Sequence, residues 1–325
     1  MKLHKILSLS TLIMIPVVAA GAGSRAYAAP LDIIPTFDSS ITSLPNAAAI
    51  ESIINSAISF YNSNITTPFA DPVQITFQNM SSGLGQSITP IYQGTYASFL
   101  SALQTTSSGD ATDTTALAHL PTVAGYTSVF GNPNIFVTAA NLRALGLGNP
   151  SGSDGTIGLN TSITNVVGGP YSLFAVTEHE IDEVLGLGSA LPSLPDARPE
   201  DLYRYDQFGN RSFTTNSAAL AYFSLNGTTD LAQFDNQNDG GDFGDWQSNP
   251  LPSGVLPKVQ DAFATPNVTP SLGLSSPEVI ALDAIGYNLN AVAVPEPSSL
   301  LLFGAGFGAL GLLGWRRKKA QQASA

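Results

Sequence analysis

The chain has 325 residues, no cysteine, 43% hydrophobic residues and 11% charged residues, with 24 Asp and Glu against 12 Lys and Arg. The absence of cysteine excludes disulfide scaffolds, thiol nucleophiles and cysteine-ligated metals. The net charge of −12 argues against nucleic acid as a partner, because phosphate backbones bind clustered cations. The hydrophobic content is sufficient for a substantial core in one large domain or two small ones.

Charge and histidine are distributed unevenly along the chain. Seven of the 12 basic residues lie near the two ends, so only five remain in the body against all 24 acidic residues. The body therefore has a formal charge near −19, which attracts cations. After His4, near the N-terminus, the only histidines are His119 and His179.

Residues 1–28 have the pattern of a secretory signal peptide. Lys2 and Lys5 precede an apolar run over residues 6–20, and Ala26-Tyr27-Ala28 forms a small-residue cleavage site. The alternative is an N-terminal membrane anchor, which the short apolar run disfavours. The segment predicts export by the Sec machinery.

The body, residues 29–290, alternates helical and strand-like segments and shows no internal repeat, which predicts one α+β unit with α/β character. Helical spacing of apolar residues indicates helices, and strict alternation indicates strands. In chain order the patterns predict a helix over 46–62, a strand over 73–77, helices over 94–104 and 139–146, a turn and strand over 154–160, and a helix over 171–185.

The helix over 171–185 carries most of the candidate chemistry. Within six positions it has Glu178, His179, Glu180, Asp182 and Glu183, and no Lys or Arg occurs from residue 144 to residue 197. Like charges on neighbouring helix positions are unfavourable, so a cation is expected nearby. Residues i and i+4 share a helix face, so His179 and Glu183 can hold one metal while Glu180 faces a water on it. The alternative is an acidic helix that faces solvent and binds nothing.

The order His-Glu-x-x-Glu is a variant of the zinc helix His-Glu-x-x-His, in which the first Glu is the general base. Thr177–Gly188 resembles the active-site helix of metzincin-type zinc metalloproteases, and residues 276–287 are similar to the closing helix of secreted bacterial members. The resemblance implies a metzincin-like domain with a mixed sheet, in which Asp154–Asn160 is the edge strand that binds substrate. The chain departs from the pattern at Ser189, where the third metzincin histidine would fall, and has no methionine after Met80.

A catalytic zinc has three protein ligands and a water, so a third ligand is expected. The downstream candidates are Asp196, Glu200, Asp201 and Asp206. Asp201 lies 18 positions after Glu183, which resembles the spacing of the third ligand in thermolysin-like enzymes, and it is predicted as that ligand. His119 is the other possibility, although its apolar neighbours favour a packing role.

A second acidic cluster occupies residues 235–246. It has the composition of a calcium loop but has Trp246 in the place of the bidentate Glu. Three interpretations stay open: a solvated turn, a structural Ca²⁺ site on Asp235, Asp239 and Asp242, or a contribution to the rim of the active site.

The C-terminal segment, residues 291–325, carries Pro295-Glu296-Pro297, an apolar run over 300–315 and a basic cluster at 316–319. As a helix the run spans about 24 Å, which predicts a short transmembrane span. Over about residues 293–319 the segment resembles the PEP-CTERM sorting tail of Gram-negative bacteria. The resemblance implies transient insertion in the inner membrane, recognition by an exosortase and removal of the helix. The implied destination is the cell surface or the extracellular polymer matrix.

Together these features predict an exported, surface-sorted zinc metalloendopeptidase. In this hypothesis His179, Glu183 and Asp201 bind Zn²⁺, and Glu180 activates a water for attack on a bond of a peptide or protein substrate. The alternative is a non-catalytic surface or matrix protein that keeps the fold, with or without a structural divalent cation.

Overall fold

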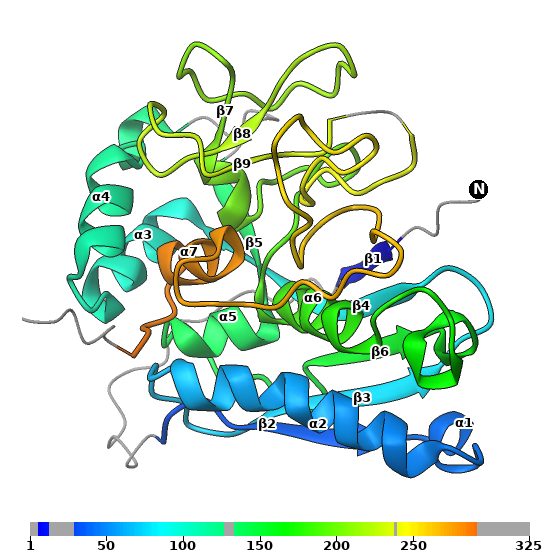
Figure 1. Ribbon diagram of the computed structural model, residues 1–325. Helices are drawn as coiled ribbons and strands as arrows, with labels where there is room; N and C mark the ends of the chain where they lie inside the picture. The colour runs from blue at the N-terminus through cyan, green and yellow to red at the C-terminus, as the bar shows by residue number, and fades with distance from the viewer. Residues whose placement is uncertain (1–5, 13–28, 127–132, 237–238, 291–325) are drawn as a thin grey trace, which may run out of the picture. The chain divides into compact units, whose positions relative to one another are not determined.

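The computed structural model describes residues 6–12, 29–126, 133–236 and 239–290 (Figure 1). The chain divides into two units, Met1–Leu289 and Asn290–Ala325, and the described sheets and helices belong to the first unit. Most of the predicted signal peptide, and the predicted sorting tail with its helix over 300–315, lie outside the described residues. None of the helices within the described ranges has the length and apolar character needed to cross a membrane.

A mixed sheet forms the centre of the first unit. Its strands follow the order β1, β4, β6, β3, β2, and one further strand, β5, pairs with β4. The strands β2, β3 and β6 are parallel, whereas β4 is antiparallel to β6, with Gly85 opposite Leu159. The bounds are β1 Ile6–Leu12, β2 Ile33–Phe37, β3 Val73–Asn79, β4 Gly85–Thr95, β5 Asn134–Thr138 and β6 Gly155–Leu159.

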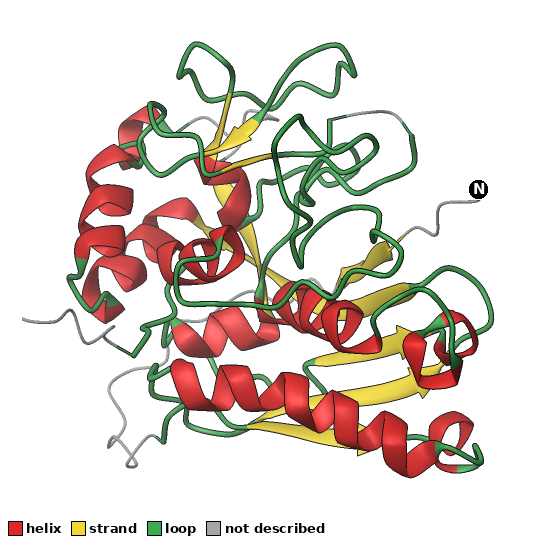
Figure 2. Ribbon diagram, in the orientation of Figure 1, coloured by secondary structure: helices red, strands yellow, loops and turns green. Residues whose placement is uncertain are grey.

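Seven α-helices are present in the described residues, and α2 and α6 lie side by side against the sheet (Figure 2). Their bounds are α1 Ser39–Thr42, α2 Ala47–Asn64, α3 Tyr96–Thr106, α4 Ala111–His119, α5 Ala139–Ala144, α6 Leu173–Leu185 and α7 Pro277–Ala284. Short 3₁₀ turns cover Val123–Gly125, Thr161–Ile163, Asn165–Val167 and Pro199–Tyr203.

After α6 the chain is mostly loop. The regular structure there is a small antiparallel sheet and α7, and the sheet consists of β7 Arg204–Tyr205, β8 Tyr222–Phe223 and β9 Ala232–Gln233. The mixed sheet and the helices confirm the predicted α+β class.

The predicted body elements have counterparts in the structure, since α2, β3, α3, α5, β6 and α6 lie at the expected places within a few residues. The predicted role of Asp154–Asn160 as an edge strand is wrong. β6 pairs with β3 on one side and β4 on the other, so it has no free edge at which a substrate strand could pair. At the other side of β4, residues Gly85–Ile91 pair in parallel with β1.

The helix α2 holds α6 in place through its buried face. Ile54, Ile58 and Tyr61 are buried at the spacing that puts them on one side of α2. The Tyr61 hydroxyl donates to the Glu178 carbonyl at 2.7 Å and to Asp182 Oδ1 at 2.9 Å.

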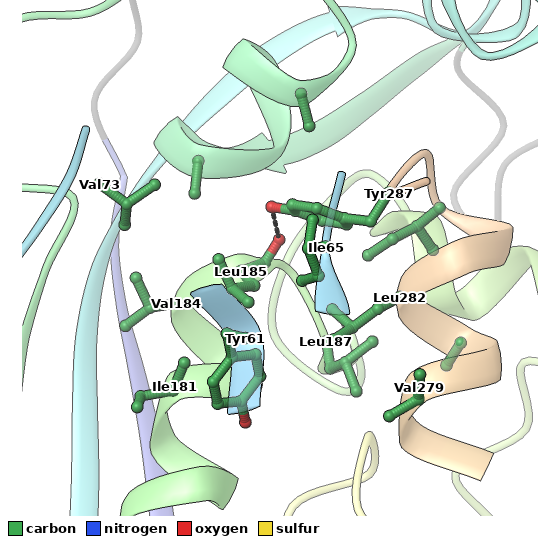
Figure 3. Packing of buried hydrophobic residues seen from close by; sticks show 14 of the residues in the cluster. Tyr61, Ile65, Val73, Ile181, Val184, Leu185, Leu187, Val279, Leu282 and Tyr287 are labelled. Atoms are coloured by element: carbon green, nitrogen blue, oxygen red, sulfur yellow. Dashed lines mark hydrogen bonds between the residues drawn. The ribbon is translucent and has the colours of Figure 1, made fainter. Parts of the chain in front are cut away.

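The other end of α6 is tied to the end of the fold. Figure 3 shows Tyr287 next to Leu185, and its hydroxyl donates to the Leu185 carbonyl at 2.6 Å. Leu282 and Val279 of α7 lie in the same apolar cluster. The helix α6 is therefore fixed along its length before any ligand is considered.

A buried ion pair links α5 to the turn before β6. Arg143 Nη1 lies 2.7 Å from Asp154 Oδ2, and both side chains are at most 5% exposed. Burial raises the pKa of Asp154 although Arg143 lowers it. We expect Asp154→Ala to lower the free energy of unfolding by about 3–5 kcal/mol, because it leaves the guanidinium buried without its partner. Urea denaturation measures the change. The exposed Asp230→Ala serves as the control and should shift it by less than about 0.5 kcal/mol.

Candidate metal centre

The helix α6 begins and ends at residues suited to those positions. The Ser172 hydroxyl accepts from the Ala175 amide at 3.2 Å, which caps the first turn. Gly186 has a φ of +133°, and a side chain there would also meet Asn141 of α5 and Ile285, the residue after α7, so glycine is needed to end the helix at this point.

All five ionisable residues between Glu178 and Glu183 are buried, each with at most 1% of its surface exposed. The interpretation of an acidic helix facing solvent is therefore wrong. Buried carboxyls need a donor, a proton or a cation, since an unpaired buried charge is costly. The carboxyls that have no hydrogen-bond donor of their own therefore mark the candidate metal site.

Three of the buried side chains form a group that can hold a metal ion: His179, Glu183 and Asp245. His179 Nε2 lies 3.8 Å from Glu183 Oε1 and 3.7 Å from Asp245 Oδ1. Ligand atoms about 2.0–2.2 Å from a tetrahedral zinc lie about 3.3–3.6 Å apart, so the two distances from His179 fit a shared ion after shifts of a few tenths of an ångström, and the oxygens of Glu183 and Asp245 lie within 4.8 Å of each other. Within the described residues Glu183 Oε1 and Asp245 Oδ2 are buried and have no hydrogen-bond partner, so both oxygens are available to a cation.

The imidazole of His179 is oriented for metal binding by residues 259 and 260. Nδ1 lies 3.0 Å from the Val259 carbonyl, which can only accept, so Nδ1 carries the proton and Nε2 has the lone pair, which accepts from the Gln260 side-chain amide. The Gln260 amide nitrogen lies 3.3 Å from that Nε2 and donates to Asp245 Oδ1 at 2.9 Å. Such a backbone partner fixes the ring orientation of ligating histidines in metal sites.

Asp245 is held by the packing of its neighbour. The Trp246 ring lies 5.1 Å from the Phe234 ring, and its indole N–H donates to Glu278 Oε1 at 3.0 Å. The Trp246 amide donates to the Gln260 carbonyl at 2.8 Å. A buried aromatic anchor thus gives this loop residue a fixed position.

The strand β4 supplies the sheet side of the site. Gly85 and Ser87 are two positions apart and so point to the same face, toward α6. The Ser87 hydroxyl donates to Glu183 Oε2 at 2.6 Å, which leaves Oε1 free toward His179. A side chain at Gly85 would contact the Glu180 carboxylate, so glycine makes the space that Glu180 occupies.

Glu180 is the carboxyl with the least compensation. Neither of its oxygens accepts a hydrogen bond from a donor in the described residues, and it can share a proton only with the neighbouring Glu183 carboxyl. Burial, and then the charges of Glu183 and Asp245, raise its pKa well above the usual range. A cation among these groups would restore the carboxylate form.

The structure does not bring the predicted third ligand, Asp201, into this group. Its oxygens accept from the Ser189 hydroxyl, the Ala190 amide at 2.9 Å and the Arg198 amide at 2.8 Å. It therefore organises the turn after α6. His119 is exposed, with Nδ1 2.8 Å from the Thr115 carbonyl, and it also lies outside the group.

The second acidic cluster contributes to the site through a residue outside the predicted set. Asp235, Asp239 and Asp242 do not form a group within ligand reach among the described residues, whereas Asp245 joins His179. Exposed Asp239 instead accepts from the Gly241 amide at 3.0 Å. Of the three interpretations of this loop, the geometry favours the third, because Asp245 joins the candidate metal group. In the sequence, the pair Asp245-Trp246 was the feature that could have indicated this ligand, because a buried Trp fixes the position of the residue next to it.

Three further carboxyls are buried outside the candidate metal group. Burial raises the pKa of Glu178, Glu200 and Asp261 to about 8 in each case. For Asp261 a hydrogen bond from the Lys258 amide at 2.9 Å opposes this rise. The native state therefore keeps protons that the unfolded chain releases near pH 4.

We expect stability to fall as pH rises from about 4 to 8, because the native state binds more protons than the unfolded state across that window. Asp261→Asn should make the slope of unfolding free energy against pH shallower, by up to about 1.4 kcal/mol per pH unit. Urea denaturation between pH 5 and pH 8 measures the slope. The exposed Asp230→Asn should leave it unchanged, and equal slopes in all three proteins would contradict the protonated native carboxyl.

The ligand assignment predicts which aspartate matters for metal. Asp245→Asn should weaken Zn²⁺ binding by more than about 100-fold, since it removes a ligand and not merely its support. Asp201→Asn should bind Zn²⁺ as the wild type does. Competition titration with a zinc chelator measures both, and circular dichroism verifies that each variant is folded. If Asp201→Asn weakened Zn²⁺ binding and Asp245→Asn did not, the third ligand would be Asp201 and not Asp245.

Comparison with known proteins identifies one region of the chain. The family model described as the PEP-CTERM protein-sorting motif matches residues 293–318. Searches of curated proteins and of solved structures gave no match for this chain. The chain carries a C-terminal PEP-CTERM sorting signal, which implies recognition by an exosortase and export to the surface or extracellular matrix of a Gram-negative bacterium.

Proposed function

We propose that the protein is a surface-sorted zinc metallopeptidase whose metal ligands are His179, Glu183 and Asp245 and whose general base is Glu180. The observation that carries the proposal is the buried group of one imidazole and two carboxylates beside Glu180, each carboxylate with one oxygen that has no hydrogen-bond partner among the described residues. The metzincin-like resemblance of Thr177–Gly188 agrees with it.

The donor set suits a catalytic zinc. Three protein ligands of N and O type leave the fourth position of a tetrahedral ion for water or substrate. Bound there, zinc would supply Lewis acidity to the attacking water and to the scissile carbonyl. Two carboxylate ligands make the donor set harder, in the hard–soft sense, than three histidines would, so Mn²⁺ is the main ion that would compete with Zn²⁺ for the site.

The chain's own residues supply positioning and proton transfer. The Val259 carbonyl keeps the proton of His179 on Nδ1, and Ser87 turns Glu183 so that one oxygen faces the imidazole. Glu180, held over Gly85, takes a proton from the attacking water and delivers it to the leaving amine.

The outer edge of β4 is where a peptide substrate would align. In the full chain β1 pairs there, along Gly85–Ile91, beside the residues that face Glu180 and Glu183. Since β1 lies within the predicted signal peptide, its removal would leave this edge open for pairing with an extended substrate.

The test compares Glu180→Gln with wild type. We expect cleavage of an unstructured protein such as casein to fall by about 10²–10⁴-fold, with about one Zn²⁺ per chain retained, because only the proton acceptor is lost. Activity assays and zinc analysis of the purified protein measure the two properties.

The matched control is Asp182→Asn, which neutralises a carboxyl of the same helix that bonds to Tyr61 and not to the metal group. It should keep both activity and zinc. Gly85→Ala should lower activity while keeping zinc, since the new methyl group displaces the Glu180 carboxylate. Wild-type protein that binds zinc but cleaves nothing would favour the non-catalytic matrix protein, and protein without zinc would overturn the metal site as well.

A further inference from the structure

A second cluster of carboxylates joins α4 to α7, apart from α6. Asp110 and Asp113 lie at the start of α4, and Asp283 lies near the end of α7. One oxygen from each lies within 4.8 Å of the others. The two helices pack against each other, so the cluster connects segments far apart in the sequence.

Asp283 supplies an independent sign of a missing ligand. It is 1% exposed, and its Oδ1 is buried without a hydrogen-bond partner in the described residues. The charged groups acting on it are the acids Asp110 and Asp113, with no Lys or Arg among them. Burial beside these acids raises the pKa of Asp283 to about 8. The carboxyl also makes side-chain hydrogen bonds with Thr112 and Asp110, but neither partner brings positive charge, so a proton or a cation must neutralise the three clustered acids.

The other two residues show how the site is built and how an ion would enter. Asp113 Oδ2 already accepts from the Ser108 hydroxyl at 2.8 Å and the Gly109 amide at 3.0 Å, which fixes that side chain. Asp110 is exposed, so one side of the cluster is open to water. Water can complete the coordination of a cation there.

The donors are all oxygen, which suits a hard cation. One oxygen of each residue lies within 4.8 Å of the others, so a single ion can contact all three. With one side open to water the site favours Ca²⁺, which accepts irregular coordination, over Mg²⁺, which needs near-ideal octahedral geometry. We propose that Asp110, Asp113 and Asp283 form a structural calcium site that joins α4 to α7.

The experiment measures thermal unfolding of the purified, chelator-treated protein with and without CaCl₂, together with calorimetric titration of Ca²⁺. We expect Ca²⁺ at about 100 times its Kd to raise the Tm by about 5 °C, and MgCl₂ to raise it less. Asp283→Asn should fold without calcium, because the amide mimics the protonated carboxyl, and should lose the calcium response.

Three further variants make the result specific. Asp110→Asn, at the exposed member, should also abolish the response, and it covers the case in which Asp283→Asn does not fold. Asp230→Asn, exposed and outside the cluster, should respond as wild type. Asp245→Asn should keep the calcium response, which separates this site from the proposed zinc site. A wild type that ignores calcium, or a response lost only in Asp245→Asn, would overturn the proposal.

Discussion

The structure depends on the burial of one highly ionisable helix. The carboxyls of α6 are taken out of water in a region with few cations, so each must be satisfied locally. Tyr61 bonds to Asp182, Ser87 bonds to Glu183, and the Leu272 amide bonds to Glu178 at 3.3 Å. These partners come from α2, from β4 and from the C-terminal loops, so each of these elements supplies a hydrogen-bond donor to a carboxyl of α6. Glu180 is the exception, and unpaired buried groups of this kind cluster at functional sites.

The loops after α6 are ordered by polar and aromatic contacts in place of regular structure. Arg204 is fully buried, donates to the Phe243 carbonyl and to Asn236 Oδ1 at 3.1 Å, and lies 4.5 Å from the centre of the Phe234 ring. A guanidinium has five donors in a fixed plane, so it can join several loop segments at once. The loop that carries Asp245 therefore has a defined shape, as a ligand-bearing segment requires.

The helices and the pair His179 and Glu183 could be predicted because they depend on spacing within one segment. Asp245 could not, since its position is set by contacts of Trp246 and Gln260 with distant residues. Asp201 carried a misleading signal. It follows Pro199 by two positions, which is the pattern of a helix start, and there its carboxylate accepts the Arg198 amide of its own turn. The spacing from Glu183 thus suggested that Asp201 is a metal ligand, whereas the structure shows that Asp201 caps the turn in which it lies.

The proposed metal centre joins residues from two distant stretches of the chain, and this determines where an ion could be acquired. His179 and Glu183 precede Asp245 by some sixty positions, and the carbonyl that orients the imidazole belongs to Val259. No such group exists in a chain threaded unfolded through a membrane. An exported chain would therefore leave the cytoplasm without a bound ion and would bind one only after folding outside. The metals of the surrounding medium, and not those buffered within the cell, would then decide which ion the protein carries.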